Sequence, residues 1–357
     1  MTGIATLCAQ PYHLLMLLGA RRMTFVSVAL ALAATVPATT QDRPAVQALA
    51  PVSLQPRFAP GQVMRYRIAL ESTSDTRQSG LVQDPQGPAQ LSVTWEAIVR
   101  LDVLAAESAA GAGGPLRMRV TYEQSAATVR SDTVEPRSEE IKQQYARLAG
   151  RSVEFTFTAG GSVSEIRGLD GLLSDESARA AVQQWFAQLS TATASPAAGV
   201  VPGQNWSSTQ AADLPLAGLS WRTDASYLRN EPCRLANPSQ ATATSGPPDC
   251  AVILARLALV TSRSLRDPTP EEYRRNRLRT SGRWTGSGES LMYVSLHTGW
   301  VVSSTQESTE QMDVTITGSP AGRGSTVRQT GTVTTRSQVF LLSDVPAPAP
   351  TPVPPAR

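Results

Sequence analysis

Residues 91–103, with the sequence LSVTWEAIVRLDV, decide the fold. Every second side chain in this stretch is apolar, with Trp95 near the centre, and the side chains between them are polar except at Ile98. Successive side chains of a β-strand point to opposite faces, so this alternation predicts a strand with one buried and one solvated face. Glycines and a proline at 111–115 then turn the chain, and residues 116–122 alternate in the same way. Together they predict an antiparallel hairpin with one wet face.

The same alternation recurs along the rest of the chain. It predicts further strands at residues 64–70, 153–157, 219–227, 251–260, 291–296, 300–305, 310–317 and 326–342. The stretch 251–260 is almost wholly apolar, which is typical of a strand covered on both faces. Residues 297–299 (His-Thr-Gly) predict a hairpin turn between their flanking strands. The predicted fold class is mainly β (α+β), built as a long antiparallel curved sheet or half-barrel.

Two or three short helices are expected beside this sheet. Residues 136–149 place apolar side chains at helical spacing and are followed by a stop at Gly150. A second helix ends near Leu189 and carries the apolar stripe Val182, Trp185, Phe186 and Leu189. At residues 269–272 (TPEE), Thr269 is expected to cap a third, short helix in a capping box.

A short motif occurs twice. Residues 59–62 (APGQ) open the first predicted strand, and residues 201–204 (VPGQ) lie about 140 positions later, before Trp206. The repetition leaves open two interpretations: a pair of related β-meanders at 58–195 and 200–343, or chance resemblance.

The ends of the chain predict export. Residues 1–38 resemble a signal peptide: Arg21 and Arg22 precede a short apolar run, and small residues favour cleavage after Ala38. Twin-arginine export, a start at Met16 and an uncleaved anchor remain alternatives, although the apolar run is short for a bilayer span. Residues 39–57 indicate a linker and residues 344–357 a Pro-rich, disordered tail. The mature chain is therefore expected in the periplasm or outside the cell, without a transmembrane anchor.

Two cysteines, Cys233 and Cys250, remain after such cleavage. In an oxidising compartment they most simply pair with each other, so the sequence predicts a disulfide. A zinc site is not expected, because His297 would be the one histidine left in the mature chain.

The sequence carries no strong catalytic signature and predicts no catalytic residue, metal site or cofactor. It contains no nucleophile elbow, zinc-protease motif, phosphate loop or dinucleotide fingerprint. Residues 286–290 (GSGES) are better explained as a bulged or turning strand than as a nucleophile. The adjacent acids at 139–140 and 271–272 keep a carboxylate-dependent hydrolase open as an alternative.

One local excess of positive charge follows the acids at 271–272. It is formed by Arg274, Arg275, Arg277 and Arg279. A solvated surface explains it, and a patch for an anionic ligand is the sharper alternative. The formal net charge of +3 over 357 residues is not that of a nucleic-acid-binding protein.

The signal, the P-G-Q strand start, the amphipathic strands and the T-G hairpin together resemble secreted β-rich envelope proteins of Gram-negative bacteria. In outline, the layout is similar to periplasmic lipoprotein carriers, which fold as a half-barrel closed by helices over an apolar cavity. This resemblance implies a non-enzymatic protein that binds a lipid, an acyl chain or another apolar ligand. Trp95, Val99, Trp185 and Phe186 are the candidate lining residues. An envelope structural module, or one that binds an envelope protein partner, is the alternative.

Overall fold

The computed structural model describes most of the chain after residue 49. The described residues are 50–80, 89–104, 116–132, 138–157, 163–169, 172–173, 182, 185–186, 188–189, 195–196, 198–212, 214–233, 249–261, 265–318 and 326–345. The predicted signal peptide and residues 346–357 of the predicted tail lie outside them.

Long strands dominate the described chain. They are β1 (Val63–Gly80), β2 (Ala89–Val103), β3 (Leu116–Ser131), β4 (Ser152–Phe157), β5 (Val163–Arg167), β6 (Asn205–Ala211), β7 (Leu219–Pro232), β8 (Asp249–Thr261), β9 (Leu278–Ser295), β10 (Val301–Gly318) and β11 (Thr326–Val345). Two helices, α1 (Ser138–Ala146) and α3 (Glu271–Arg275), accompany them, and the described residues of the 182–189 segment are helical.

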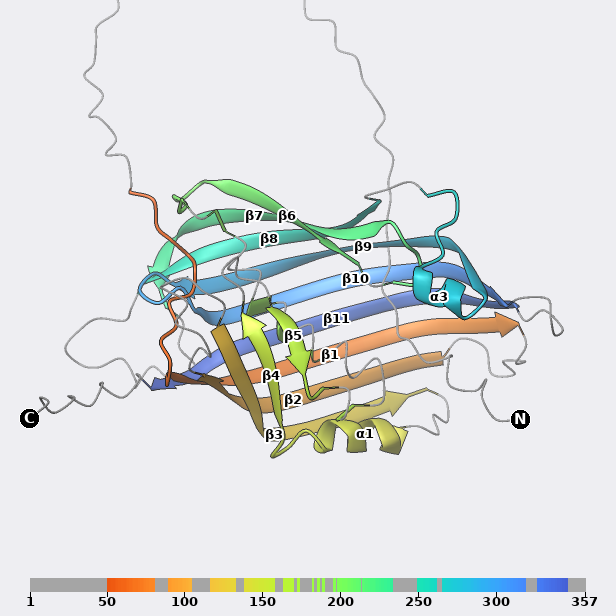
Figure 1. Ribbon diagram of the computed structural model, residues 1–357, viewed down its shortest axis with the longest axis horizontal. Helices are drawn as coiled ribbons and strands as arrows, with labels where there is room; N and C mark the ends of the chain where they lie inside the picture. The colour runs from red at the N-terminus through yellow and green to blue at the C-terminus, as the bar shows by residue number, and fades with distance from the viewer. Residues whose placement is uncertain are drawn as a thin grey trace, which may run out of the picture.

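All these strands form one antiparallel sheet in the order β5-β4-β3-β2-β1-β11-β10-β9-β8-β7-β6. Strands that are consecutive in the chain are neighbours in the sheet, except β5 and β6. The first and last long strands, β1 and β11, pair along their length, whereas β5 and β6 lie at opposite edges. Figure 1 shows β4 and β5 crossing in front of the long strands. The sheet is therefore curved and open between β5 and β6, which confirms the predicted mainly-β fold class.

The two P-G-Q motifs make the same turn. At 59–62 and 201–204 the Gln N–H donates to the carbonyl three residues earlier, at 3.1 and 3.0 Å. The Gln side-chain oxygen accepts from the N–H of that same earlier residue, at 3.0 and 3.1 Å. Gly61 and Gly203 have φ of 84° and 88°, which the third position of a type II turn requires. One turn precedes β1 and the other precedes β6. We call β1–β5 the first meander and β6–β11 the second, and they join where β1 meets β11. That they are related repeats stays a prediction.

The face of the sheet that carries Trp95, which we call the inner face, holds the core. Its fully buried side chains include Met64, Tyr66, Ile68, Trp95, Val99, Met118, Val120 and Tyr122. Removing each large apolar side chain from water stabilises the fold by about 1.5–3 kcal/mol. The opposite, outer face carries exposed ion pairs between neighbouring strands, such as Arg328 with Asp313 at 2.7 Å. The alternation at 91–103 thus separates a buried from a solvated face, as predicted.

Residues 50–57 differ from the expected free linker because they contribute to the core. Leu54 is fully buried, and Val52 exchanges backbone hydrogen bonds of 2.8 and 2.9 Å with Val200. Burial of isolated apolar side chains holds this segment in place. Such contacts leave no periodic pattern in the sequence, so the sequence alone predicts a linker here.

The start of α3 also differs from the expected capping box. Pro270 occupies the N-cap position without a side-chain cap hydrogen bond. Thr269 is buried, and its hydroxyl instead accepts from the backbone N–H of Thr280 at 3.0 Å. The Thr269 hydroxyl is therefore bonded to β9, and it does not cap the helix as the sequence predicts.

Candidate functional site

The four predicted lining residues meet in one aromatic cluster on the inner face. Trp95 and Val99 lie on β2, and Trp185 and Phe186 come from the 182–189 segment; each is at most 1% exposed. The Trp185 and Phe186 rings are 4.2 Å apart, and Phe186 lies 4.8 Å from Phe155 of β4. The segment therefore fills the space in front of the sheet, so these residues form packed core here. Their role as a ligand lining stays a prediction.

Two polar contacts fasten the 182–189 segment to the sheet. The indole N–H of Trp185 donates to the hydroxyl of Tyr122 on β3 at 3.4 Å, and the side-chain amide of Gln188 donates to the Ser337 hydroxyl on β11. Burial raises the pKa of Tyr122, so its hydroxyl stays protonated and neutral. These contacts join the segment to both meanders. Gln188 is not predictable from the apolar stripe, because it is a polar residue between apolar ones.

A polar belt crosses the middle of the inner face beside this segment. It consists of Ser290, Ser304, Ser308, Thr335 and Ser337, from β9, β10 and β11, all buried. The side-chain oxygen of Gln188, itself 2% exposed, has no hydrogen-bond partner among the described residues. Glu310 lies at the margin of the belt, where a Cβ added at Gly286 would lie 2.9 Å from its carboxylate. Because buried polar groups need partners, the belt makes this part of the interior able to bind polar groups.

A second apolar cluster occupies the inner face beyond the belt. It is formed by Leu216, Leu259, Trp284, Met312, Val314 and Val333. Trp221 and Ile316 pack against it while remaining half-buried. The inner face thus presents apolar, polar and apolar zones in succession along the strands.

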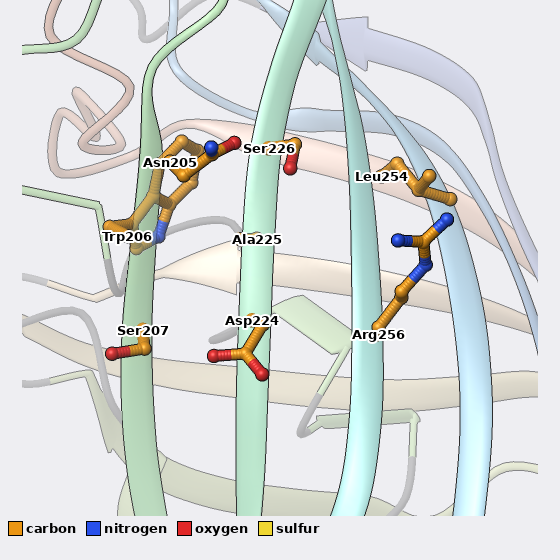
Figure 2. A pocket seen from close by; sticks show the side chains of 8 residues that line it. All are labelled: Asn205, Trp206, Ser207, Asp224, Ala225, Ser226, Leu254 and Arg256. Atoms are coloured by element: carbon orange, nitrogen blue, oxygen red, sulfur yellow. The ribbon is translucent and has the colours of Figure 1, made fainter. Parts of the chain in front are cut away.

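A cavity of about 380 Å³ lies between β6, β7 and β8 (Figure 2). It is lined by Asn205, Trp206, Ser207, Asp224, Ala225, Ser226, Leu254 and Arg256. Asp224 is bound by Arg222 at 2.7 Å, and Arg256 contacts Glu289 at 3.0 Å. Both charges in the lining therefore already have counter-ions, and the cavity offers mainly hydroxyl and amide groups.

The four arginines of the predicted anionic-ligand patch lie on or just after α3. Arg274 and Arg275 pair with Glu271 at 3.0 and 3.7 Å, and Arg279 pairs with Asp267. Arg277 is exposed, with a left-handed φ of 58°. Three of the four arginines thus contact a carboxylate, two of them the same one, and anion binding at this patch stays a prediction.

The adjacent acid pairs are not brought together. Glu139 lies on α1 and contacts Lys142 at 2.6 Å, whereas Glu271 lies on α3, well apart from α1 in Figure 1. His297 is exposed in the β9–β10 turn, which confirms the hairpin predicted there. Within the described ranges, no group of three or more His, Cys, Asp or Glu side chains could hold a metal ion.

The predicted disulfide is confirmed. Cys233 follows β7 and Cys250 opens β8, with their Cα atoms 4.9 Å apart. The bond closes the end of the β7–β8 hairpin, next to the pair formed by Pro232 and Asp249. Among the residues with described placement, no helix is long and apolar enough to cross a membrane.

No protein-family model matches the chain, and no curated protein matches it. A solved structure described as showing lipid–protein interactions in lipovitellin matches over 83% of this chain, with 11% identity and a TM-score of 0.42. The match covers 27% of the lipovitellin chain, so the protein spans about a quarter of that chain's length.

Proposed function

We propose that this protein is an exported, non-enzymatic binding protein that holds an acyl chain or another apolar ligand against its inner face. The observation that carries the proposal is that the 182–189 segment, which we call the cover, lies over that face. Trp185 and Phe186 lie over the buried aromatic residues of the sheet, in the connection that joins the two sheet edges. A ligand that takes their place would bury its apolar surface without breaking a strand pair.

The contacts of the cover fit this role. Apart from apolar packing, the described contacts that fasten it are the hydrogen bonds of Trp185 and Gln188. Each such bond has a net contribution of about 0.5–1.5 kcal/mol, which is comparable to the burial of one or two methylene groups of an acyl chain. Displacement also exposes the four buried apolar side chains of the segment, each of which contributes about 1.5–3 kcal/mol. Only a long acyl chain, at about 0.8 kcal/mol per buried methylene group, can therefore offset it. The polar belt beside it provides partners for a polar headgroup.

Native mass spectrometry and lipid extraction of the purified protein test the proposal, together with uptake of a spin-labelled stearic acid. We expect one acyl chain bound per protein. Phe186→Ala should bind the probe several-fold more tightly, because it leaves an apolar space for the chain. Phe340→Ala is the matched control, since Phe340 is half-buried on the outer face and should leave uptake unchanged. Ligand-free protein after extraction, with no uptake by the wild type or by Phe186→Ala, would overturn the proposal.

A second candidate function is an envelope structural or partner-binding module. The exposed side chains of edge strand β6 favour it, because an unpaired strand edge presents free backbone hydrogen-bonding groups. A pull-down from envelope extract with and without residues 346–357 tests whether the tail also contributes. An unchanged set of captured proteins would exclude the tail from that role.

A further inference from the structure

Among the described strands, β6 has a neighbour on one side only, whereas its counterpart in the first meander, β1, has a neighbour on both sides. The two P-G-Q turns make β1 and β6 equivalent: Gly61 donates to the carbonyl of Val103 at the end of β2, and Gly203 donates to that of Tyr227 on β7. On the side away from β2, β1 is paired with β11 along its length. On the side away from β7, β6 has no neighbouring strand in the described sheet. The position beside β1 is thus occupied by β11, whereas no described strand occupies the equivalent position beside β6.

The hydrogen-bond register of β6 shows which groups face the open side. Tyr227 donates to the carbonyl of Gln204, and Ala212 donates to that of Leu219, so the even-numbered residues of β6 bond to β7. In an antiparallel pair, alternate residues face away from the partner. The backbone N–H and C=O groups that point outward are therefore those of Asn205, Ser207, Thr209 and Ala211, whose side chains are all exposed.

The two sheet edges are protected differently. β5 is five residues long, and Glu165 within it has a left-handed φ of 50° and a charged side chain paired with Arg167. Charge, shortness and distortion are the usual means by which edge strands avoid further pairing. β6 (NWSSTQA) has seven residues and contains no charge, no proline and no positive φ. It therefore keeps the features of an edge that can accept a strand.

We propose that the occupant is a second copy of this chain, which pairs its own β6 antiparallel to the first about a two-fold axis at Ser208. This register places Asn205 opposite Ala211 and Ser207 opposite Thr209 of the second copy. All outward N–H and C=O groups then meet each other, which gives about eight hydrogen bonds across the joint. The interface is isologous and closes on itself, so the product is a dimer.

The charge pattern on β7 agrees with this register. Arg222 lies beside Thr209 and Asp224 beside Ser207 on the outer face. With the axis at Ser208, Arg222 of each copy lies in line with Asp224 of the other, three strand spacings or about 14 Å away, and each charge keeps its own partner within the chain. An axis at Ser207 would oppose two aspartates, and one at Thr209 would oppose two arginines. The second copy also adds Thr209 beside Ser207 and Ala211 beside Asn205, at the mouth of the cavity shown in Figure 2.

Sedimentation equilibrium or light scattering of the purified protein, up to millimolar concentration, tests this proposal. We expect a reversible dimer that dissociates on dilution, because a joint along one strand is a small interface. Ser207→Pro removes an outward donor that β7 does not use, and Thr209→Lys adds a charge to the edge. Each should leave the protein monomeric at concentrations where the wild type is dimeric. Gln338→Lys is the control, since it adds the same charge on the exposed face of an internal strand.

The charge register has its own test. Arg222→Asp should weaken the dimer by no more than about threefold, since exposed charges about 14 Å apart are largely screened, and the double variant Arg222→Asp/Asp224→Arg should restore it. Circular dichroism and thermal unfolding confirm that each variant folds. A wild type that stays monomeric throughout, or a dimer that survives both Ser207→Pro and Thr209→Lys, would overturn the proposal. Because these edge variants leave the inner face unchanged, acyl-chain uptake separates this result from the proposed ligand binding.

Discussion

The indole N–H of Trp185 lies 3.4 Å from the hydroxyl oxygen of Tyr122, and both side chains are completely buried. This hydrogen bond ties the 182–189 segment to β3, two strands away from the junction of the meanders. Tyr122 is also the aromatic neighbour of Trp95, with ring centroids 6.3 Å apart. Tyr122 therefore contacts both Trp185 of the covering segment and Trp95 of the sheet.

Tyr122→Phe should destabilise the protein by about 1–3 kcal/mol, because it leaves the buried indole N–H of Trp185 without an acceptor. Trp185→Phe should cost more, since it also leaves a cavity. Urea unfolding of both variants and of the double variant gives the coupling energy between the two side chains. Strictly additive losses would contradict a direct bond between them.

Gly299→Ala should release residues 50–57 from the β9–β10 hairpin. Gly299 has a φ of 70°, and a Cβ there would overlap the backbone carbonyl of Gln55. Gly150→Ala is the matched control, because Gly150 has a φ of 75° and nothing lies within 4 Å of the added Cβ. Thermal unfolding should show a loss of about 1 kcal/mol for the control, from backbone strain alone, and a larger loss for Gly299→Ala. Equal losses would mean that the contact with Gln55 contributes nothing.

The sequence predicts which segments form amphipathic strands, but it predicts poorly where those strands begin and end. Alternation identifies 91–103 and 219–227 because each strand is apolar on one face and polar on the other. It breaks down in β10, where the inner face carries Ser304, Ser308 and Glu310 between apolar ends. The expected break between residues 305 and 310 is therefore wrong, and β10 is one continuous strand. The polar belt that obscured this pattern is also the part of the candidate site that sequence reasoning missed.

Edge strands are a second class of omission. Neither β5 nor β6 is predicted, because an edge strand buries little and needs no alternating pattern. β6 has half-buried Trp206 and Ser208 on its inner face and five exposed side chains. The repeated P-G-Q turn marks the start of β6 instead. The motif is short, and its role as a strand-opening turn becomes evident only from its backbone hydrogen bonds.

Loss of the Cys233–Cys250 bond should lower stability by about 2–4 kcal/mol, because the bond restricts the unfolded chain around a loop of this length. The double variant Cys233→Ala/Cys250→Ala, unfolded in urea, measures the loss. Reductant should shift the unfolding midpoint of the wild type to nearly that of the double variant and leave the double variant unchanged. A midpoint of the wild type that does not respond to reductant under unfolding conditions would contradict a stabilising role.

Glu154 gives a pH-dependent contribution to stability. Hydrogen bonds from Arg119 and Arg117, at 2.7 and 2.6 Å, hold the pKa of this carboxyl below its usual value. A group whose pKa is lower in the folded state stabilises the fold above its unfolded pKa, which is about 4.3 for glutamate. That contribution is lost as the pH falls through the folded value. Glu154→Gln should therefore destabilise the protein at neutral pH, and the difference from wild type should shrink in acid.

Urea unfolding of wild type and Glu154→Gln at several pH values between neutral and strongly acidic measures this difference. Since Glu154 lies on the outer face and is partly solvated, high salt should reduce the effect at neutral pH. If the two proteins differ in their free energy of unfolding by the same amount above and below the unfolded pKa, the effect of the substitution comes from packing and hydrogen bonding and not from charge. A gap that closes in acid assigns the stabilisation to the ionised carboxylate between the two arginines.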